Sequence, residues 1–217
     1  MIKVAAFVFN AFGENSYVIY DESGEAILID PGNYDADESA ELTGFIEENG
    51  LKPVLVANTH AHVDHVLGVA FAKRKWGIPF ALHEQDAVVL KSVRAYAPNY
   101  GFAAYDEPEI NQWLVPGQPL KFGTSSLEVI FVPGHAPGHV AFYEAESKQL
   151  IAGDVLFRES IGRTDLPGGN HATLLRSIRE KLFALPDDVK VFPGHGPSTT
   201  IGHEKKYNPF FRNSGPL

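Results

Sequence analysis

Four side chains that can bind a metal lie close together in the segment THAHVDH, residues 59–65: His60, His62, Asp64 and His65. Such a cluster is costly to desolvate unless a cation binds it. In an extended segment, residues two apart face the same way, so His60 and His62 can hold one ion. Asp64 and His65 fall where the chain turns into the next helix and can reach a second ion. A solvated histidine-rich loop is the alternative.

Further candidate ligands follow apolar runs that are typical of strands. LEVIFVPGH leads to His135, QLIAGD to Asp154 and VKVFPGH to His195, just as VLVANTH leads to His60. Loops at strand ends on a rigid sheet commonly hold catalytic groups. This repeated placement favours a metal centre over a chance surface cluster.

These side chains divide into two sets, because a catalytic zinc usually has three protein ligands and one open position. One set is His60, His62 and His135, and the other is Asp64, His65 and His195. Asp154 has two oxygens and could bridge the ions. Metal binding lowers the pKa of water from about 15.7 to about 7, so a metal-bridging hydroxide could serve as nucleophile at neutral pH.

Composition narrows the remaining possibilities. The 217 residues are 44% apolar and contain no linker rich in Pro, Gly or Ser, so we expect one domain over 1–217. The chain lacks cysteine, which excludes thiolate ligands. A net charge of −9 argues against nucleic acid as a partner. No signal-peptide cleavage region or membrane-length apolar run is present, so we expect no membrane partner and a cytoplasmic location. The oligomeric state stays open.

Strand-like and helix-like segments occur in both halves of the chain. Strands are expected at 4–10, 15–21, 25–32, 53–60, 78–84, 118–123, 125–135, 139–147, 148–157 and 189–195. Helices are expected at 38–50, 65–77, 86–96 and 173–185. This distribution predicts stacked layers in which helices cover sheets.

The motifs also resemble a known family. THAHVDH, a strand-end histidine, a strand-end GD and a late GHGP resemble the metallo-β-lactamase superfamily. GHAPGH, SIGRTDLPGG, VFPGHGPSTTIGHEK and NPF resemble its hydroxyacylglutathione hydrolase-like (type II glyoxalase-like) branch. The resemblance implies an α/β (α+β) fold, the four-layer αββα sandwich, with the metal site at one edge. It also implies that the two ligand sets above hold two ions with Asp154 shared, most often zinc, with iron or manganese possible.

The resemblance further implies a metal-dependent hydrolase of thioesters, with a glutathione thioester such as S-lactoylglutathione as the leading small-molecule substrate. The hydroxide would attack the carbonyl, the thiolate would leave, and Asp64 would orient the hydroxide. Classical members carry a C-terminal helical domain with basic contacts to glutathione. This sequence stops soon after HEKKYNPF, so we expect that domain to be absent, which leaves another ester or thioester open.

Three other functions stay open. A persulfide dioxygenase of the same fold uses one iron, held here by His60, His135 and Asp154, and shares the GRTD motif. A lactonase or other carboxylic ester hydrolase would use the same site. A non-catalytic metal-binding module is the third. The complete ligand set argues against the first and the last.

Several further residues have both a structural and a functional interpretation. Asp30 in LIDPG could orient a ligand histidine or hold the following Pro-Gly turn, and the two are even. For His139 the start of a strand is favoured over support of the site. His83 is expected to be semi-buried and satisfied. His171 and His203 are expected at the surface or at helix caps.

Charged and aromatic residues near the expected site complete the candidates. Arg163 and Asp165 in GRTDL favour an ion pair that fixes a loop over a contact with a substrate carboxylate. Lys205, Lys206 and Arg212 could contact an anionic substrate or be solvated. The segment 97–116 could form a lid over the pocket or an ordinary loop, and its length favours the lid. The aromatic residues in or near it are Tyr96, Tyr100, Phe102, Tyr105 and Trp113.

Overall fold

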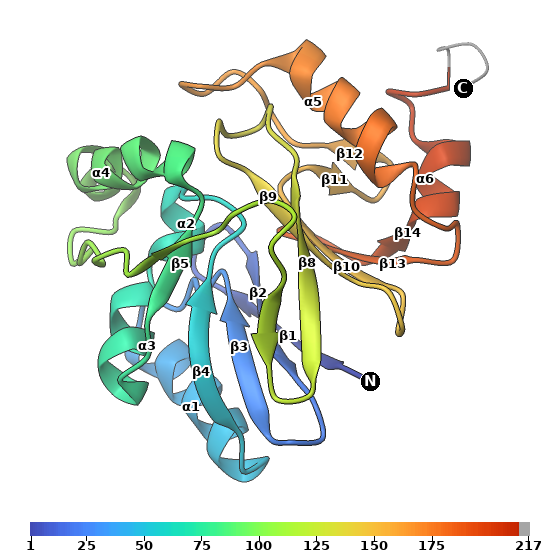
Figure 1. The fold of residues 1–217 in the computed structure, drawn as a ribbon. Coiled ribbons are helices and arrows are strands. Elements are labelled where there is room, and N and C mark those ends of the chain that lie inside the picture. The colour runs from blue at the N-terminus through green and yellow to red at the C-terminus, as the bar shows by residue number, and fades with distance from the viewer. Residues whose placement is uncertain (213–217) are drawn as a thin grey trace.

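Two six-stranded sheets face each other in the computed structural model, which describes residues 1–212 (Figure 1). The first sheet has the order β1 (Lys3–Phe9), β2 (Glu14–Tyr20), β3 (Glu25–Ile29), β4 (Lys52–Ala57), β5 (Phe80–Leu82) and β6 (Gln112–Trp113). The second has the order β14 (Thr199–Thr200), β13 (Lys190–Pro193), β10 (Gln149–Gly153), β9 (Val140–Glu144), β8 (Ser125–Phe131) and β7 (Leu120–Phe122). A short hairpin joins β11 (Leu156–Phe157) to β12 (Ser160–Ile161).

Helices lie on the outer side of each sheet (Figure 1). The first sheet is accompanied by α1 (Ala36–Glu48), α2 (Val63–Val66), α3 (Val69–Trp76) and α4 (Ala87–Tyr96). The second is accompanied by α5 (His171–Ser177), which continues as a π-helical turn over Ile178–Leu182, and by α6 (Ile201–Tyr207). Short 3-10 helices cover Glu84–Asp86 and Ala97–Tyr100. Within residues 1–212, no helix has the length and apolarity needed to cross a membrane.

Three separate hydrophobic clusters identify the layers. Val18 and Leu28 belong to the cluster between the first sheet and its helices, whereas their neighbours Ile19 and Ile27 belong to the cluster between the sheets. Successive side chains of a strand point to opposite faces, so each central strand contributes to two clusters. Leu150 belongs to a third cluster, between the second sheet and its helices. The fold is therefore the expected αββα four-layer sandwich.

The structure corrects three local expectations. The helix expected over 65–77 is interrupted before Gly68, whose N–H donates to the Pro31 carbonyl at 2.8 Å. A Cβ at Gly68 would lie 2.0 Å from Asn33 Oδ1, so only glycine allows this close approach. The helix expected over 173–185 becomes a π-helical turn after Ser177. Residues 199–207, for which no element was expected, form β14 and α6.

The carboxylate of Asp21 joins the two sheets. Asp21 follows β2, is 4% exposed and accepts hydrogen bonds from the backbone N–H and hydroxyl of Thr124 at 2.8 and 3.0 Å. The hydroxyl of Ser125, at the start of β8, donates to the same carboxylate at 2.8 Å. Ser23 adds a backbone donor at 2.9 Å. Burial acts to raise the pKa of Asp21, but the hydrogen bonds from Ser23 and Ser125 hold it well below its usual value.

Replacing Asp21 with asparagine should lower the free energy of unfolding by about 2 kcal/mol at neutral pH, because several donors lose a charged acceptor. The stabilisation by the carboxylate is fully present above the unfolded-state pKa of about 3.9 and is lost as the pH falls below it. The difference between wild type and Asp21→Asn should therefore stay constant down to about pH 5 and narrow progressively as the pH falls below about 4 in denaturant titrations. A difference that does not change with pH would contradict this role. Asp106→Asn, which alters an exposed ion pair with Arg74, is the matched control.

Candidate metal centre

All of the predicted ligands lie in segments that follow strands at one edge of the sandwich. His60 and His62 follow β4, Asp64 and His65 lie in α2, His135 follows β8, Asp154 follows β10 and His195 follows β13. β10 and β13 are parallel neighbours, so the segments after them emerge side by side. An antiparallel bridge between Glu14 and His195 ties the last of these segments to the first sheet. The two sheets together thus position the cluster.

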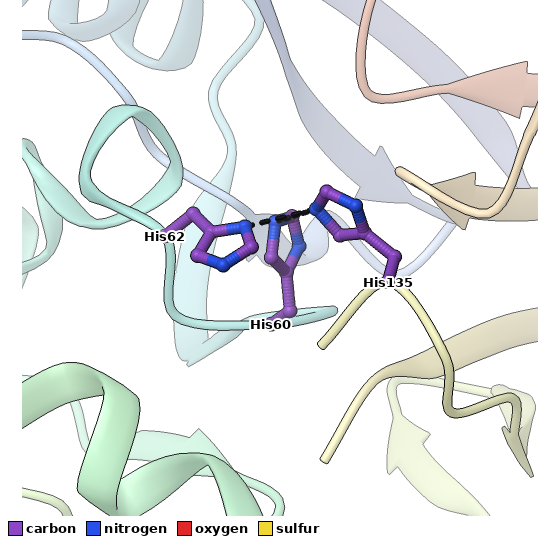
Figure 2. Close-up of side chains that lie close together, drawn as sticks. All are labelled: His60, His62 and His135. Atoms are coloured by element: carbon purple, nitrogen blue, oxygen red, sulfur yellow. Dashed lines mark hydrogen bonds between the residues drawn. The ribbon is translucent and has the colours of Figure 1, made fainter. Parts of the chain in front are cut away.

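The first set consists of three imidazoles turned toward one another (Figure 2). His62 Nδ1 lies 2.9 Å from His135 Nε2, and His60 Nε2 lies 3.3 Å from the same atom. His60 and His135 are buried, and His62 lines the cleft described below. Burial lowers the pKa of all three, to about 3 for His62, so the rings are neutral near pH 7.

Hydrogen bonds on the far side of two of these rings determine which nitrogen carries the hydrogen. The Thr59 hydroxyl donates to Asp30 Oδ2 at 2.6 Å, so toward His60 Nδ1, at 3.0 Å, it can only accept. The Arg163 carbonyl accepts from His135 Nδ1 at 2.8 Å. Both rings therefore direct a lone pair from Nε2 into the space between them. Two lone pairs 3.3 Å apart repel each other, and a cation between them removes that repulsion.

The second set joins His65 and His195 to two carboxylates. His195 Nε2 lies 3.1 Å from Asp64 Oδ2, and His65 Nε2 lies 3.5 Å from both Asp64 Oδ2 and Asp154 Oδ1. Asp154 Oδ2 is also 3.5 Å from His135 Nε2, so this carboxylate lies between the two sets. Burial acts to lower the pKa of His65 and of His195, but Asp64 and Asp154 raise both. The carboxylates therefore draw positive charge to this position.

Orphaned polar atoms show that the residues fit a metal. His65 Nε2 and Asp154 Oδ1 are buried and have no hydrogen-bond partner within residues 1–212. Asp30 accepts from His65 Nδ1 at 3.2 Å, so in the neutral ring that a metal requires the lone pair lies on Nε2 and faces the carboxylates. Each set offers one atom per residue within 4.8 Å of the others. Imidazole and carboxylate donors without thiolate suit zinc, iron or manganese.

The structure separates the alternatives for two residues near the ligands. Asp30 has the orienting role, since it accepts from His65 Nδ1 and from both the N–H and the hydroxyl of Thr59. The favoured interpretation of His139 as a simple strand start was wrong. Its buried Nε2 accepts from the Asp154 N–H at 3.0 Å, and its ring stacks on His60 with 4.7 Å between centroids. His139 therefore supports both ligand sets.

Asp86 supports the site as well and was not predicted. Its carboxylate accepts from the N–H of Ala61 at 2.7 Å and from the N–H of Gly138 at 2.6 Å. These donors belong to the two loops that carry the three histidines of the first set. Burial raises the pKa of Asp86 to about 6 although both N–H groups favour the ionised form. The sequence suggested a helix start, and Asp86 does precede α4, but its side chain makes no capping bond there.

Glu14 is a second buried acid that was not predicted. It is fully buried, accepts from the Ser16 hydroxyl at 2.8 Å, and places Oε1 3.7 Å from His65 Nδ1. Burial raises the pKa of Glu14 well above its usual value. The sequence signal that could have identified Glu14 is a lone charged residue at the start of the uncharged strand-like run ENSYVIY.

A cleft of about 1020 Å³ opens above the ligands. Among the expected lid residues, Tyr96 and Tyr100 line it, whereas Phe102 is buried in the core and Trp113 belongs to edge strand β6. Tyr105 packs against the core outside the lining. The segment 97–116 thus contributes to the pocket wall only at its beginning.

The charged candidates have mainly structural contacts. Arg163 lines the cleft but forms the expected ion pair with Asp165, with two contacts of 2.7 Å. Lys205 pairs with Asp187, while Lys206 and Arg212 lie over the Tyr207 ring. Among the described residues, these last three cations lie outside the lining of the cleft.

The remaining histidines lie outside the site, as expected. His83 is buried against Phe131 and caps a 3-10 helix through the N–H of Gln85. His171 is exposed at the start of α5, and His203 pairs with Glu159.

Comparison with known proteins agrees with this geometry. The model of the metallo-beta-lactamase superfamily matches residues 10–195. The chain belongs to this superfamily. It is 38% identical over 205 residues to hydroxyacylglutathione hydrolase GloC of Haemophilus influenzae, covering 94% of this chain and 95% of that protein. It is therefore a metallo-hydrolase of this superfamily, with a divalent metal implied by the fold and the His/Asp clusters.

Two solved structures of similar sequence share the fold across nearly the whole chain. The BLEG-1 B3 metallo-beta-lactamase aligns with a TM-score of 0.87 at 36% identity, covering 98% of this chain and 100% of that one. TTHA1623 in a di-iron-bound form aligns with a TM-score of 0.85 at 38% identity, covering 95% and 100%. These superpositions match the αββα arrangement described above.

Replacing Asp86 with asparagine should weaken metal affinity by about 10- to 100-fold, because the amide NH₂ would face one of the two N–H donors. The two loops that carry the histidines would then separate. Competition with a chromogenic chelator measures the affinity, and circular dichroism reports whether the fold persists. Asp37→Asn, at an exposed position in α1, is the matched control. An Asp86→Asn protein that binds metal as tightly as wild type would contradict the role.

Proposed function

We propose that this protein hydrolyses thioesters, with glutathione thioesters such as S-lactoylglutathione as the leading substrates. The observation that carries the proposal is the pair of adjacent ligand sets at an open cleft, where His65 Nε2 and Asp154 Oδ1 are buried without a hydrogen-bond partner. The full-length similarity to a protein named hydroxyacylglutathione hydrolase supports the substrate class.

Two divalent ions are part of the proposal. His60, His62 and His135 would hold the first, and Asp64, His65 and His195 the second, with Asp154 between them. Zinc is the leading metal, and the di-iron form of TTHA1623 makes iron the main alternative. When bound, such ions supply Lewis acidity that activates water and polarises a carbonyl.

The chain's own residues then bind and orient the reactants. The cleft admits the substrate so that its carbonyl faces the floor, which Asp64 and Asp154 line. The Asp64 carboxylate would orient the attacking water and hold the proton that it releases. The Asn10 side chain holds the short helix α2 in place by donating to the Asp64 backbone carbonyl at 3.0 Å. The thiol of the substrate, with a pKa of about 8.5, leaves as the thiolate without the help of a strong general acid.

Thiol release from S-lactoylglutathione by the metal-loaded protein tests the proposal. Wild type should release the thiol in step with loss of the thioester absorbance. Asp64→Asn should lower kcat by about 100-fold, because proton transfer loses its acceptor. Asp188→Asn, at an exposed ion pair with Lys148, is the control and should match wild type. Absence of hydrolysis by protein with both sites filled would refute the thioester assignment.

Hydrolysis of a β-lactam is the second candidate. The similarity to BLEG-1, named a B3 metallo-beta-lactamase, favours it, since the same floor could face a lactam carbonyl. An amine leaves less readily than a thiolate and needs a proton. A chromogenic cephalosporin assayed beside the thioester separates the two, and oxygen uptake with glutathione persulfide tests the dioxygenase alternative.

A further inference from the structure

One wall of the cleft is an apolar face of α4. Val88, Val89, Ser92, Ala95 and Tyr96 of this helix line the cleft. Their spacing of three and four residues places them on one side of the helix. Four of these five side chains are aliphatic or aromatic. The fifth, Ser92, donates its hydroxyl hydrogen to the Val89 carbonyl at 2.7 Å.

This wall is exposed yet held in place. Val88 is 68% exposed, Tyr100 55% and Phe12 41%, although all three are hydrophobic and border the catalytic floor. The rings of Phe12 and Tyr100 meet edge to face at 5.6 Å, and Phe12 meets the buried Phe102 in the same way at 5.5 Å. An exposed apolar patch beside a functional site indicates a binding surface. The ring contacts show that this surface is preformed.

The positive charge at the cleft comes from a segment other than α4. Among the residues of the range 1–212 that line it, Arg163 is the one lysine or arginine, and it lies in the segment after β12 rather than in α4. Its guanidinium is 61% exposed on the side-chain scale, so it can reach an anionic group in addition to Asp165. Lys91 and Arg94 of α4 are not among the lining residues. The α4 wall is therefore uncharged.

The size of the cleft exceeds what a short acyl group can fill. Its volume of about 1020 Å³ is at the upper end for small-molecule sites, which span about 300–1,000 Å³. A lactoyl group has three carbons and a hydroxyl, so it is too small and too polar to cover the apolar side chains of this wall. The apolar wall would then remain hydrated in the substrate complex.

We propose that the α4 wall, formed by Val88, Val89, Ala95 and Tyr96 with Phe12 and Tyr100, binds an apolar acyl group of four or more carbons. The thiol part of the substrate then extends toward the segment after β12, where its carboxylates can meet Arg163. This inference rests on the proposed thioester hydrolysis and narrows its substrate to acyl thioesters larger and less polar than the lactoyl one.

An acyl-chain series tests the proposal. The metal-loaded protein is assayed with acetyl, butyryl, hexanoyl and lactoyl thioesters of glutathione under identical conditions. Burial of each methylene against the wall should raise kcat/KM by about threefold, somewhat below the value for complete burial. The hexanoyl thioester should thus exceed the acetyl one by roughly two orders of magnitude. The lactoyl thioester should be slower than the butyryl one.

A variant in the wall separates binding of the acyl group from catalysis. Val88→Ser should lower kcat/KM for the hexanoyl thioester by about fivefold and leave the acetyl thioester nearly unchanged, because only the longer chain reaches Val88. Val8→Ser is the matched control, since Val8 is also 68% exposed but lies on β1 outside the cleft.

The outcomes distinguish the inference from the proposed function. The inference alone is overturned if kcat/KM stays flat or falls as the acyl chain lengthens. It is also overturned if Val88→Ser lowers kcat/KM equally for all substrates. If the metal-loaded protein hydrolyses none of the thioesters in the series, the proposed function is overturned and the inference with it. A rising series that Val88→Ser flattens and Val8→Ser does not supports both.

Discussion

The direction of the imidazole lone pairs is the constraint on which the rest of the site depends. One carboxylate, that of Asp30, sets this direction for both ligand sets, directly through His65 Nδ1 and through the Thr59 hydroxyl for His60. The Arg163 carbonyl does the same for His135. Once the outer nitrogens of His60, His65 and His135 are used, the inner nitrogens of these rings direct their lone pairs into a small volume. Such convergence is unfavourable by itself and becomes favourable around cations.

The sandwich makes this convergence possible because each sheet contributes part of the cluster. Asp30 and His60 follow β3 and β4 of the first sheet, whereas Asp154 and His195 follow β10 and β13 of the second. A backbone hydrogen bond joins the two halves: the N–H of Asn15 in β2 donates to the carbonyl of Gly194, which follows β13, at 2.7 Å. Buried hydrophobic clusters on both sides of each sheet then hold the strand ends in register. The site is therefore as rigid as the layers that carry it.

The layers and the grouping of the ligands could be predicted from the sequence, because both follow from local patterns. His60, His135, Asp154 and His195 each follow an apolar strand-like run, and strands that end at one edge bring their loops together. Asp86 could not be predicted, since its role depends on Gly138, 52 residues away. The break before Gly68 has the same origin, in a contact with the Asn33 loop. Tertiary contacts of this kind leave no periodic signal in the sequence.

Anomalous diffraction from crystals of the zinc-loaded protein tests the central claim most directly. The claim is that the converging lone pairs mark two cation positions. Data collected on both sides of the zinc absorption edge should show two anomalous peaks, one among His60, His62 and His135 and the other among Asp64, His65 and His195. A single peak, or peaks away from these side chains in crystals grown with excess zinc, would contradict the account.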